Sequence, residues 1–292
     1  MNTSTDERGP RPWWDTHQGL SPTQAMADID QAITHRILNH PRSLQKRIGP
    51  SEIGNPCDHC LAARLAGWDK HEPGIPWTTT RGTAMHEWMH LLFNQADTNR
   101  PDYAQRGHLR RWVTEETVAV GTIGDTLITG STDLLDLHAG QTVDWKFVGA
   151  SSLRRYRTHG PSQTYRVQAH LYAKGWNDAG VRVDTVSICF LPAVSAKFSD
   201  HFWWHEPYQP QVADDALARA NHLHTQLALL ESISPAARDE WISTLPRAQG
   251  CWDCARYPRD HTPSPPVERG IALDIPTRPS RPQPNTLEGH HS

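Results

Sequence analysis

The sequence predicts an α+β domain in which helices flank a central mixed sheet. Helical patterns dominate before residue 97, and the apolar period changes to two between Trp112 and Val148. Helices and strands then alternate up to about residue 231. A core of about 230 residues is large enough to bury most of its apolar surface without disulfides.

Serine, proline and glycine residues set the boundaries of the expected helices. Ser21 and Pro22 supply an N-cap and a first-turn proline, and Gly67 and Gly180 close two later helices. Residues 51–56 predict a loop. We expect helices over residues 21–39, 61–66, 80–96, 162–179 and 210–231, and a short one after residue 234.

Alternating apolar residues predict five strands, near 113–120, 125–137, 142–148, 183–191 and 198–206. The first three are close enough in sequence to form a meander. In the third strand, Val143, Trp145 and Phe147 share the face that belongs against a helix, while Asp144 and Lys146 share the other face.

The composition indicates which partners and which cellular compartment we expect for the chain. A net charge of −3 gives no global basic surface, so contact with nucleic acid needs a local patch. The sequence contains neither an apolar run long enough for a membrane span nor an apolar signal-peptide core, so we expect a cytoplasmic protein with reduced cysteines. We expect disordered tails at 1–20 and 259–292, on either side of a domain over 21–258.

A carboxylate–lysine group lies at the centre of the expected meander. Asp133 is in the second strand, and hairpin pairing can bring it close to Asp144 in the third. Two carboxylates suit Mg²⁺ or Mn²⁺, and the amine of Lys146 can offset charge that develops at a phosphate. An Asp followed by Asp-x-Lys also arises by chance, as a solvated ion pair on a hairpin.

Four motifs occur in one order along the chain: His86 on a helix, Gly130-x-x-Asp133, Asp144-x-Lys146, and Gln168-x-x-x-Tyr172 on the following helix. In this order they resemble the RecB-like branch of the PD-(D/E)XK nucleases. The resemblance is to the CRISPR-associated and phage exonucleases that carry a cysteine-bound metal centre, and it covers about residues 51–254.

The resemblance implies a restriction-endonuclease-like fold and a divalent-metal-dependent deoxyribonuclease. His86, Asp133 and Asp144 would bind Mg²⁺ or Mn²⁺. Lys146, Gln168 and Tyr172 would be catalytic-site residues, with Gln168 positioning the lysine or the nucleophile. The expected activity is that of an exonuclease on single-stranded DNA or DNA ends, in recombination, repair or phage replication.

Two Cys-x-x-Cys pairs flank this region, Cys57 with Cys60 and Cys251 with Cys254. Four thiolates can bind Zn²⁺ or an iron–sulfur cluster, and pairs this far apart would clamp the two ends of the domain together. The resemblance implies a 4Fe–4S cluster, which we favour over Zn²⁺. The relatives usually have one cysteine before the core and three after it, whereas this chain has two and two. We expect Cys189 to be a core residue.

A local basic patch with two tyrosines lies between the third strand and the helix of Gln168. It consists of Arg154, Arg155, Tyr156, Arg157, Tyr165 and Arg166. Arginines suit phosphates and tyrosines can stack on unpaired bases, so we expect DNA to bind here. A solvated loop would carry the same residues.

Two other functions use the same residues. His86, Glu87 and His90 match the H-E-x-x-H signature of zinc metalloproteases. The extended form of that motif is absent, so Glu115 or Glu116 would have to supply the third ligand from an expected strand. The other alternative is a non-catalytic DNA-binding module whose metal is structural.

Overall fold

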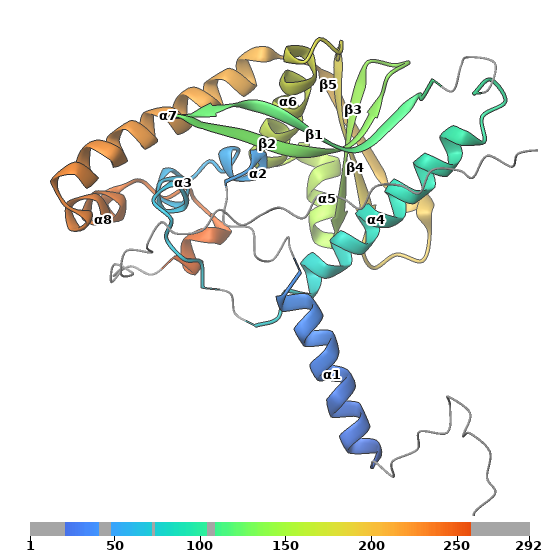
Figure 1. Ribbon diagram of the computed structural model, residues 1–292, viewed down its shortest axis with the longest axis horizontal. Coiled ribbons are helices and arrows are strands. Elements are labelled where there is room, and N and C mark those ends of the chain that lie inside the picture. Colours follow the sequence, from blue (N-terminus) through green and yellow to red (C-terminus); the bar gives the residue numbers. More distant parts are fainter. Residues whose placement is uncertain (1–20, 41–47, 72–73, 104–108, 258–292) are drawn as a thin grey trace, which may run out of the picture. The chain divides into compact units, whose positions relative to one another are not determined.

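Five strands form one mixed sheet in the order β1-β2-β3-β4-β5, with helices packed on both faces (Figure 1). The strands are β1 Trp112–Ile123, β2 Thr126–Asp136, β3 Gln141–Val148, β4 Thr185–Pro192 and β5 Phe202–Pro207. The β3–β4 pair is parallel, and the other three pairs are antiparallel. The predicted α+β class with a central mixed sheet is confirmed.

The helices are α1 Pro22–Leu38, α2 Pro50–Ile53, α3 Asp58–Leu65, α4 Trp77–Thr98, α5 Ala150–His159, α6 Gln163–Asp178, α7 Pro210–Ile233 and α8 Pro235–Thr244, with 3₁₀ turns η1 Phe198–Asp200 and η2 Trp252–Arg256. The computed structural model describes residues 21–40, 48–71, 74–103 and 109–257. The tails expected at 1–20 and 259–292 lie outside the described residues. No helix within these ranges combines the length and the hydropathy needed to cross a membrane.

Strand β3 has two chemically different faces. Val143 and Trp145 pack with Met89 of α4 on one face. Val148 points to the other face, where it joins the larger core with α6, α7 and β4. Asp144 shares that face, because successive side chains of a strand point to opposite sides. The polar group expected from the sequence therefore lies on the side of the sheet that α6 covers.

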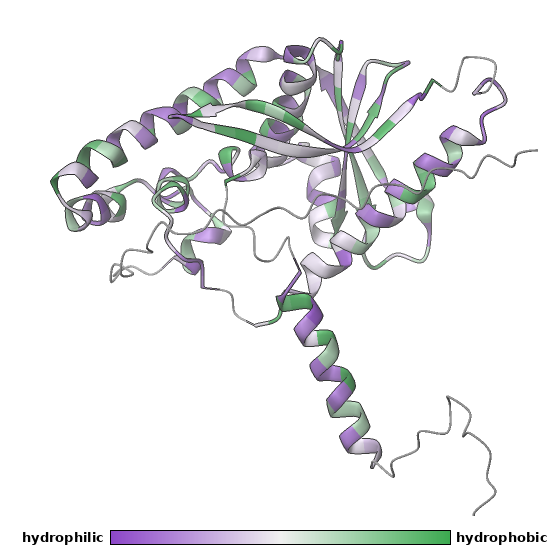
Figure 2. Ribbon diagram, viewed as in Figure 1, coloured by the Kyte–Doolittle hydropathy of each residue, from purple (hydrophilic) through white to green (hydrophobic). Residues whose placement is uncertain are grey.

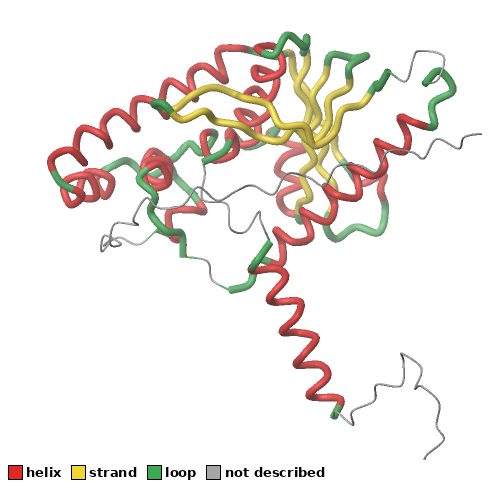
Figure 3. The backbone as a smooth tube through the Cα atoms, in the orientation of Figure 1, coloured by secondary structure: helices red, strands yellow, loops and turns green. Residues whose placement is uncertain are grey.

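Strands β1 and β2 form a long hairpin that runs toward α7 (Figure 3). Its turn is at 124–125, shorter than the predicted turn at 121–124. Gly121 instead lies at a β-bulge inside β1, with φ +148, and a Cβ there would come 2.6 Å from Leu217 Cδ1 of α7. The positive φ favours glycine here, and a larger residue would also force the end of the Leu217 side chain to move.

Helix α7 buries one stripe of small and aliphatic residues. Its buried positions are Ala213, Ala216, Leu217, Ala220, Leu223 and Leu227, at the three- and four-residue spacing of one helical face. Figure 2 shows this alternation of hydrophobic and hydrophilic residues along the helix. The stripe packs on the β1–β2 hairpin and on α6 and α8.

Three local expectations were wrong. Helix α5 was not predicted, because it buries only Leu153 and Tyr156, too few apolar residues for a visible period. Residues 50–53 form the helical turn α2 rather than a loop, since Glu52 accepts a hydrogen bond from the Gly49 N–H (2.9 Å). Strand β5 begins at Phe202 rather than 198, because η1 occupies the preceding residues.

Asp136, at the end of β2, ties the β2–β3 turn to the start of β1. Its carboxylate accepts hydrogen bonds from Arg111 (2.7–3.1 Å), from the indole of Trp112 (3.2 Å) and from the backbone N–H groups of His138 and Ala139 (3.0 and 3.2 Å). Burial, the largest influence, would raise the pKa of Asp136, but the Arg111 and backbone donors together hold it below its ordinary value.

The substitution Asp136→Asn should lower the free energy of unfolding at pH 7 by about 1–3 kcal/mol, because several donors lose a charged acceptor. The lowered pKa makes this contribution complete above the pKa of an unfolded aspartate, about 3.9, and it is lost as the pH falls through the folded value. The free energies of unfolding that urea titrations give for the two proteins should therefore begin to converge below pH of about 4 and meet only below the folded pKa of Asp136.

The matched control is Asp184→Asn, which removes an exposed ion pair with Arg182 and should cost less than about 1 kcal/mol. An equal loss of stability in the two variants would contradict the role given to Asp136.

Candidate functional site

Side chains from α4, β1, β2, β3 and α6 line one cavity of about 450 Å³. They are His86, Glu115, Asp133, Asp144, Lys146, Gln168 and Tyr172. All six residues that the sequence analysis assigned to the metal and catalytic groups are therefore brought together. Glu115 joins them from β1.

Asp133 lies where β2 and β3 separate. The ladder between these strands covers three residue pairs and ends at Leu134 opposite Val143. At the next position the Oδ2 atom of Asp133 accepts a hydrogen bond from the Trp145 backbone N–H (2.8 Å), in place of a strand-to-strand bond. Its Oδ1 atom is thereby left facing His86, 3.1 Å from Nδ1.

Asp144 and Lys146 form a buried ion pair, with Oδ2 and Nζ 2.5 Å apart. Burial raises the pKa of Asp144 and is opposed by the charge of Lys146. For Lys146, burial acts to lower the pKa, but the carboxylates of Asp144 and Asp133 outweigh it and raise the value. The remaining oxygen of Asp144, Oδ1, is buried and has no hydrogen-bond partner among the described residues.

Helix α6 holds Lys146 in place through a chain of contacts. Gln168 Oε1 accepts a hydrogen bond from Lys146 Nζ (3.1 Å), and Gln168 Nε2 donates to Tyr172 Oη (3.2 Å). The ring of Tyr165 lies 4.8 Å below the same ammonium group, a cation–π contact. Because Tyr172 fixes the orientation of the amide, the oxygen of Gln168 is kept toward the lysine.

Gly130 allows α6 to approach β2. A Cβ at this position would come 2.8 Å from Tyr172 Cε1 and 2.7 Å from Pro50 Cγ. Both distances are shorter than van der Waals contact, so the glycine of the Gly-x-x-Asp motif is required by packing against α6 and α2.

Glu115 was weighed in the sequence only as a protease ligand, and its place beside the carboxylates was missed. Strand register puts it opposite Asp133, between the pairs Thr114–Leu134 and Glu116–Thr132. Its Oε1 atom lies 3.7 Å from His86 Nδ1. Its φ of 53° is the one positive φ of a non-glycine residue in the described ranges, a conformation that costs roughly 1–3 kcal/mol. No local sequence signal announces such a backbone kink.

His86 is the positive partner of this group in the absence of a metal. Burial would lower its pKa, but the hydrogen bonds that the imidazole donates to Asp133 and Glu115 outweigh burial and raise it to about 9. A cation that bound His86 would therefore displace a proton from the imidazole.

The divalent cation that the resemblance implies fits these residues. One imidazole nitrogen and several carboxylate oxygens are ligands that Mn²⁺ and Mg²⁺ accept. The ligand atoms of His86, Glu115 and Asp133 all lie within 4.8 Å of one another. Asp144 lines the same cavity, and its buried Oδ1 has no hydrogen-bond partner among the described residues; this is costly for a charged acceptor, and a bound cation would remedy it.

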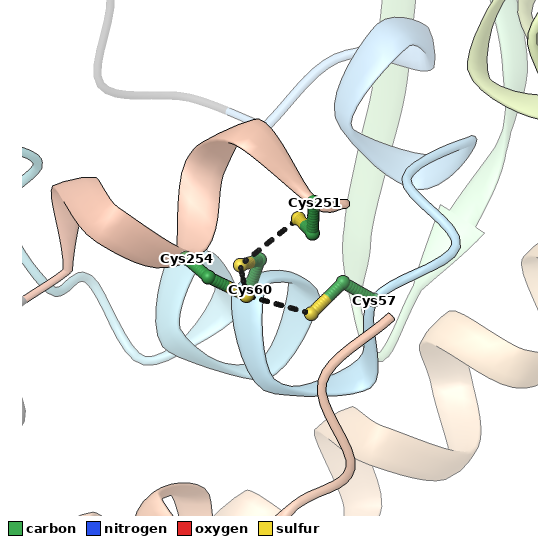
Figure 4. Close-up of side chains that lie close together, drawn as sticks. All are labelled: Cys57, Cys60, Cys251 and Cys254. Atoms are coloured by element: carbon green, nitrogen blue, oxygen red, sulfur yellow. Dashed lines mark hydrogen bonds between the residues drawn. The ribbon is translucent and has the colours of Figure 1, made fainter. Parts of the chain in front are cut away.

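The four cysteines of the two Cys-x-x-Cys pairs also come together (Figure 4). The sulfur of Cys254 lies 3.4 Å from that of Cys57 and 3.5 Å from that of Cys60, and Cys60 lies 3.7 Å from Cys251. Cys57 is the N-cap residue of α3 and Cys251 that of η2, so the group joins the N-terminal and C-terminal parts of the domain, as the sequence analysis expected.

Cys189 lies apart from this group, on β4, with 1% of its surface exposed. It packs with Met89, Val143 and Trp145. The expectation of a core residue is confirmed.

The arginines of the expected DNA-binding patch differ in their surroundings. Arg154 and Arg155 are exposed on α5, whereas Arg157 donates to the carbonyl oxygen of Asp200. Arg166 is bound to Glu206 (2.6 Å) and lines a different cavity, of about 410 Å³.

The two tyrosines of this segment also separate. Tyr156 is 5% exposed and stacks on Phe190 (4.5 Å between centroids), so its expected stacking on bases was wrong. Tyr165 lies against Lys146.

The H-E-x-x-H match does not form a paired histidine site. His90 Nδ1 lies 2.8 Å from Thr114 Oγ1, and Asn94 contacts the same ring. Within the described residues, the potential ligands that converge on His86 are Glu115 and Asp133 rather than His90. Glu87 is exposed.

No protein-family model matches the chain, and no curated protein matches its sequence. Several solved structures are similar to it. An alkaline exonuclease from Laribacter hongkongensis, LHK-Exo, covers 71% of this chain and 97% of its own length, with 11% identity and a TM-score of 0.42. LHK-Exo in complex with dAMP gives 12% identity and a TM-score of 0.43 over the same shares. A phage-related exonuclease from Haemophilus somnus 129PT covers 69% of this chain and 94% of its own, with 15% identity and a TM-score of 0.36.

The substitution Glu115→Gln should weaken Mn²⁺ binding at least about tenfold, because it removes one charged oxygen from the ligand group. Isothermal titration calorimetry of the metal-free protein with Mn²⁺ measures this without any substrate. Glu116→Gln, one residue away and exposed, is the matched control and should bind Mn²⁺ as the unaltered protein does. Equal affinities for all three proteins would show that Glu115 does not contact the ion.

Proposed function

We propose that this protein is a divalent-metal-dependent deoxyribonuclease that hydrolyses phosphodiester bonds in DNA. The observation that carries the proposal is one cavity lined by His86, Asp133 and Asp144, in which Asp133 faces His86 and Lys146 is held between Asp144 and Gln168. Carboxylates, imidazole and a clamped lysine are the set that hydrolysis of a phosphate diester with a divalent cation requires.

His86, Asp133 and Asp144 would hold the cation, with Glu115 beside them. A divalent cation in this position supplies Lewis-acid activation of the attacking water and of the phosphate oxygens. The three carboxylates make the cavity strongly acidic, so a DNA phosphate approaches it favourably only when a cation balances their charge.

Lys146 acts directly on the phosphate. An ammonium group has three N–H donors, and two of them are engaged by Asp144 and Gln168. The third can donate to a non-bridging phosphate oxygen, on which negative charge grows as water attacks phosphorus and the bond to the leaving sugar oxygen breaks. Because the lysine is already held, this stabilisation needs no reorganisation during the reaction.

Gln168 and Tyr172 position the lysine rather than touch the substrate. The hydrogen bond between them fixes the amide, which in turn fixes the direction of Nζ. Tyr165 adds the face of its ring below the ammonium. These contacts hold Lys146 Nζ in the position and direction from which it can donate to the phosphate.

The substrate we propose is DNA that is single-stranded or has free ends, cut by an exonuclease in recombination, repair or phage replication. Arginines 154 and 155 are exposed on α5, which begins directly after β3, and we propose that they contact DNA phosphates. Arg155 also donates to Tyr156 Oη (3.2 Å), and Arg157 and Arg166 are held by the Asp200 carbonyl oxygen and by Glu206, so these three would contribute less than Arg154.

Lys146→Ala should reduce cleavage about 10²–10³-fold, because a donor to the transition state is lost, and Asp144→Asn should also be inactive. DNA affinity measured by fluorescence anisotropy should change little, since arginine–phosphate contacts remain. The assay uses end-labelled single- and double-stranded DNA and a circular substrate, each with Mg²⁺, Mn²⁺ or chelator. Circular DNA should stay intact if free ends are needed.

Lys174→Ala is the matched control, because this lysine of α6 pairs with Asp178 at the surface, away from the cavity. It should cleave normally. Full turnover by well-purified Lys146→Ala protein would refute the proposed mechanism, and binding without cleavage by the unaltered protein would favour the non-catalytic module.

His86→Ala should shift half-maximal nuclease activity to higher Mn²⁺ concentration, about tenfold or more, whereas His90→Ala should change it little. The structural reason is that His90 is occupied by Thr114 and Asn94. Casein cleavage measured in parallel tests the metalloprotease alternative. Hydrolysis of casein that requires Glu87 and both histidines would decide for the protease.

A further inference from the structure

The sulfur atoms of the four-cysteine group are closely spaced. All four lie within 4.8 Å of one another, and three of the pairs are 3.4, 3.5 and 3.7 Å apart. Figure 4 shows the side chains of Cys57, Cys60, Cys251 and Cys254 converging on one point between α3 and η2.

This spacing is that of ligands on one ion. A metal–sulfur distance of 2.3 Å in a tetrahedron places neighbouring sulfurs roughly 3.8 Å apart. In a 4Fe–4S cluster each thiolate ligates a different iron, so the metal core separates the sulfurs and spreads them well beyond that distance. The observed group would have to expand on every side to admit a cluster.

The surroundings oppose such an expansion. Cys57 and Cys60 are 0% and 2% exposed and pack in a core with Trp68, Ile242 and Tyr257. Close-packed cores do not yield by several ångströms without losing contacts.

Polar contacts also fix the two segments that carry the cysteines. Asn55 donates to Asp253 (3.2 Å), and Lys70 pairs with the same carboxylate (3.3 Å). These contacts hold the stretch before Cys57 against η2 at the present separation.

The arrangement along the chain agrees with this geometry. Each Cys-x-x-Cys pair begins a helical turn, Cys57 at α3 and Cys251 at η2, and each turn contributes two thiols. Two such pairs are the usual donor set of a closed structural zinc site. The relatives with a cluster have a different division of cysteines, one before the core and three after it.

We propose that the four cysteines bind a single Zn²⁺ ion and not the 4Fe–4S cluster that the resemblance implies. The ion is structural, because its four protein ligands leave no position for a substrate or a water. It joins the N-terminal and C-terminal parts of the domain, and its binding is coupled to folding because the two pairs meet only in the folded chain.

The test is the metal content of the full-length protein, purified without oxygen from cells supplied with both iron and zinc. We expect one zinc per chain, no acid-labile sulfide and no visible absorption. Iron and sulfide at about four each per chain, with a brown colour, would overturn the proposal. One iron without sulfide would overturn the assignment to zinc, and a protein with neither metal would overturn the site.

A conservative variant separates one ion from a cluster by a second measurement. Cys251 is partly exposed, and Cys251→His should keep one zinc per chain because three cysteines and a histidine also bind Zn²⁺. Cys251→Ser should lose zinc and melt at a lower temperature, whereas Cys189→Ala should keep the ion. Loss of zinc from Cys189→Ala, or full zinc retention and unchanged melting in Cys251→Ser, would contradict the assignment. None of these measurements uses DNA, so the outcome is independent of the nuclease assay.

Discussion

The hydrogen bond from the Trp145 backbone N–H to the Asp133 carboxylate is the interaction on which the site depends. This hydrogen bond lies where the β2–β3 ladder ends. In a longer ladder a backbone carbonyl of β2 would accept from the N–H group, and here a carboxylate oxygen of Asp133 takes its place. The strands can part without leaving a buried N–H unsatisfied. Asp133 and Asp144 both line the cavity at this point, so strand register rather than a loop places these carboxylates around it.

Ion pairs offset much of the buried charge in this cavity. Lys146 balances Asp144, and His86 balances Asp133 and Glu115. Removing one partner would leave an uncompensated charge in a poorly solvated space, which is far more costly than losing a surface ion pair. The positive φ of Glu115 adds backbone strain at the same place. Buried charge and backbone strain thus reduce the local stability around the cavity, and the large core around α6 and α7 compensates for this loss.

The cysteine group and the cavity are connected through α2. Residues Pro50 and Glu52 of this short turn line the cavity, and the chain reaches Cys57 only four residues after α2 ends. A metal that holds Cys57 against η2 therefore also restrains one wall of the cavity. Gly130 completes this arrangement, since its missing side chain lets Pro50 and Tyr172 meet over β2.

The features that could be predicted from the amino-acid sequence are those that depend on the periodic spacing of side chains along a strand or a helix. Strand alternation separated Asp144 and Lys146 from Val143 and Trp145, and helical spacing placed Gln168 and Tyr172 on one face, because these patterns depend only on local geometry. Tertiary structure decided what depends on register and contact: the nearness of Glu115 to His86, the burial of Tyr156 and the spacing of the four sulfurs. Each of these is set by residues far apart in the chain, so no local pattern carries the information.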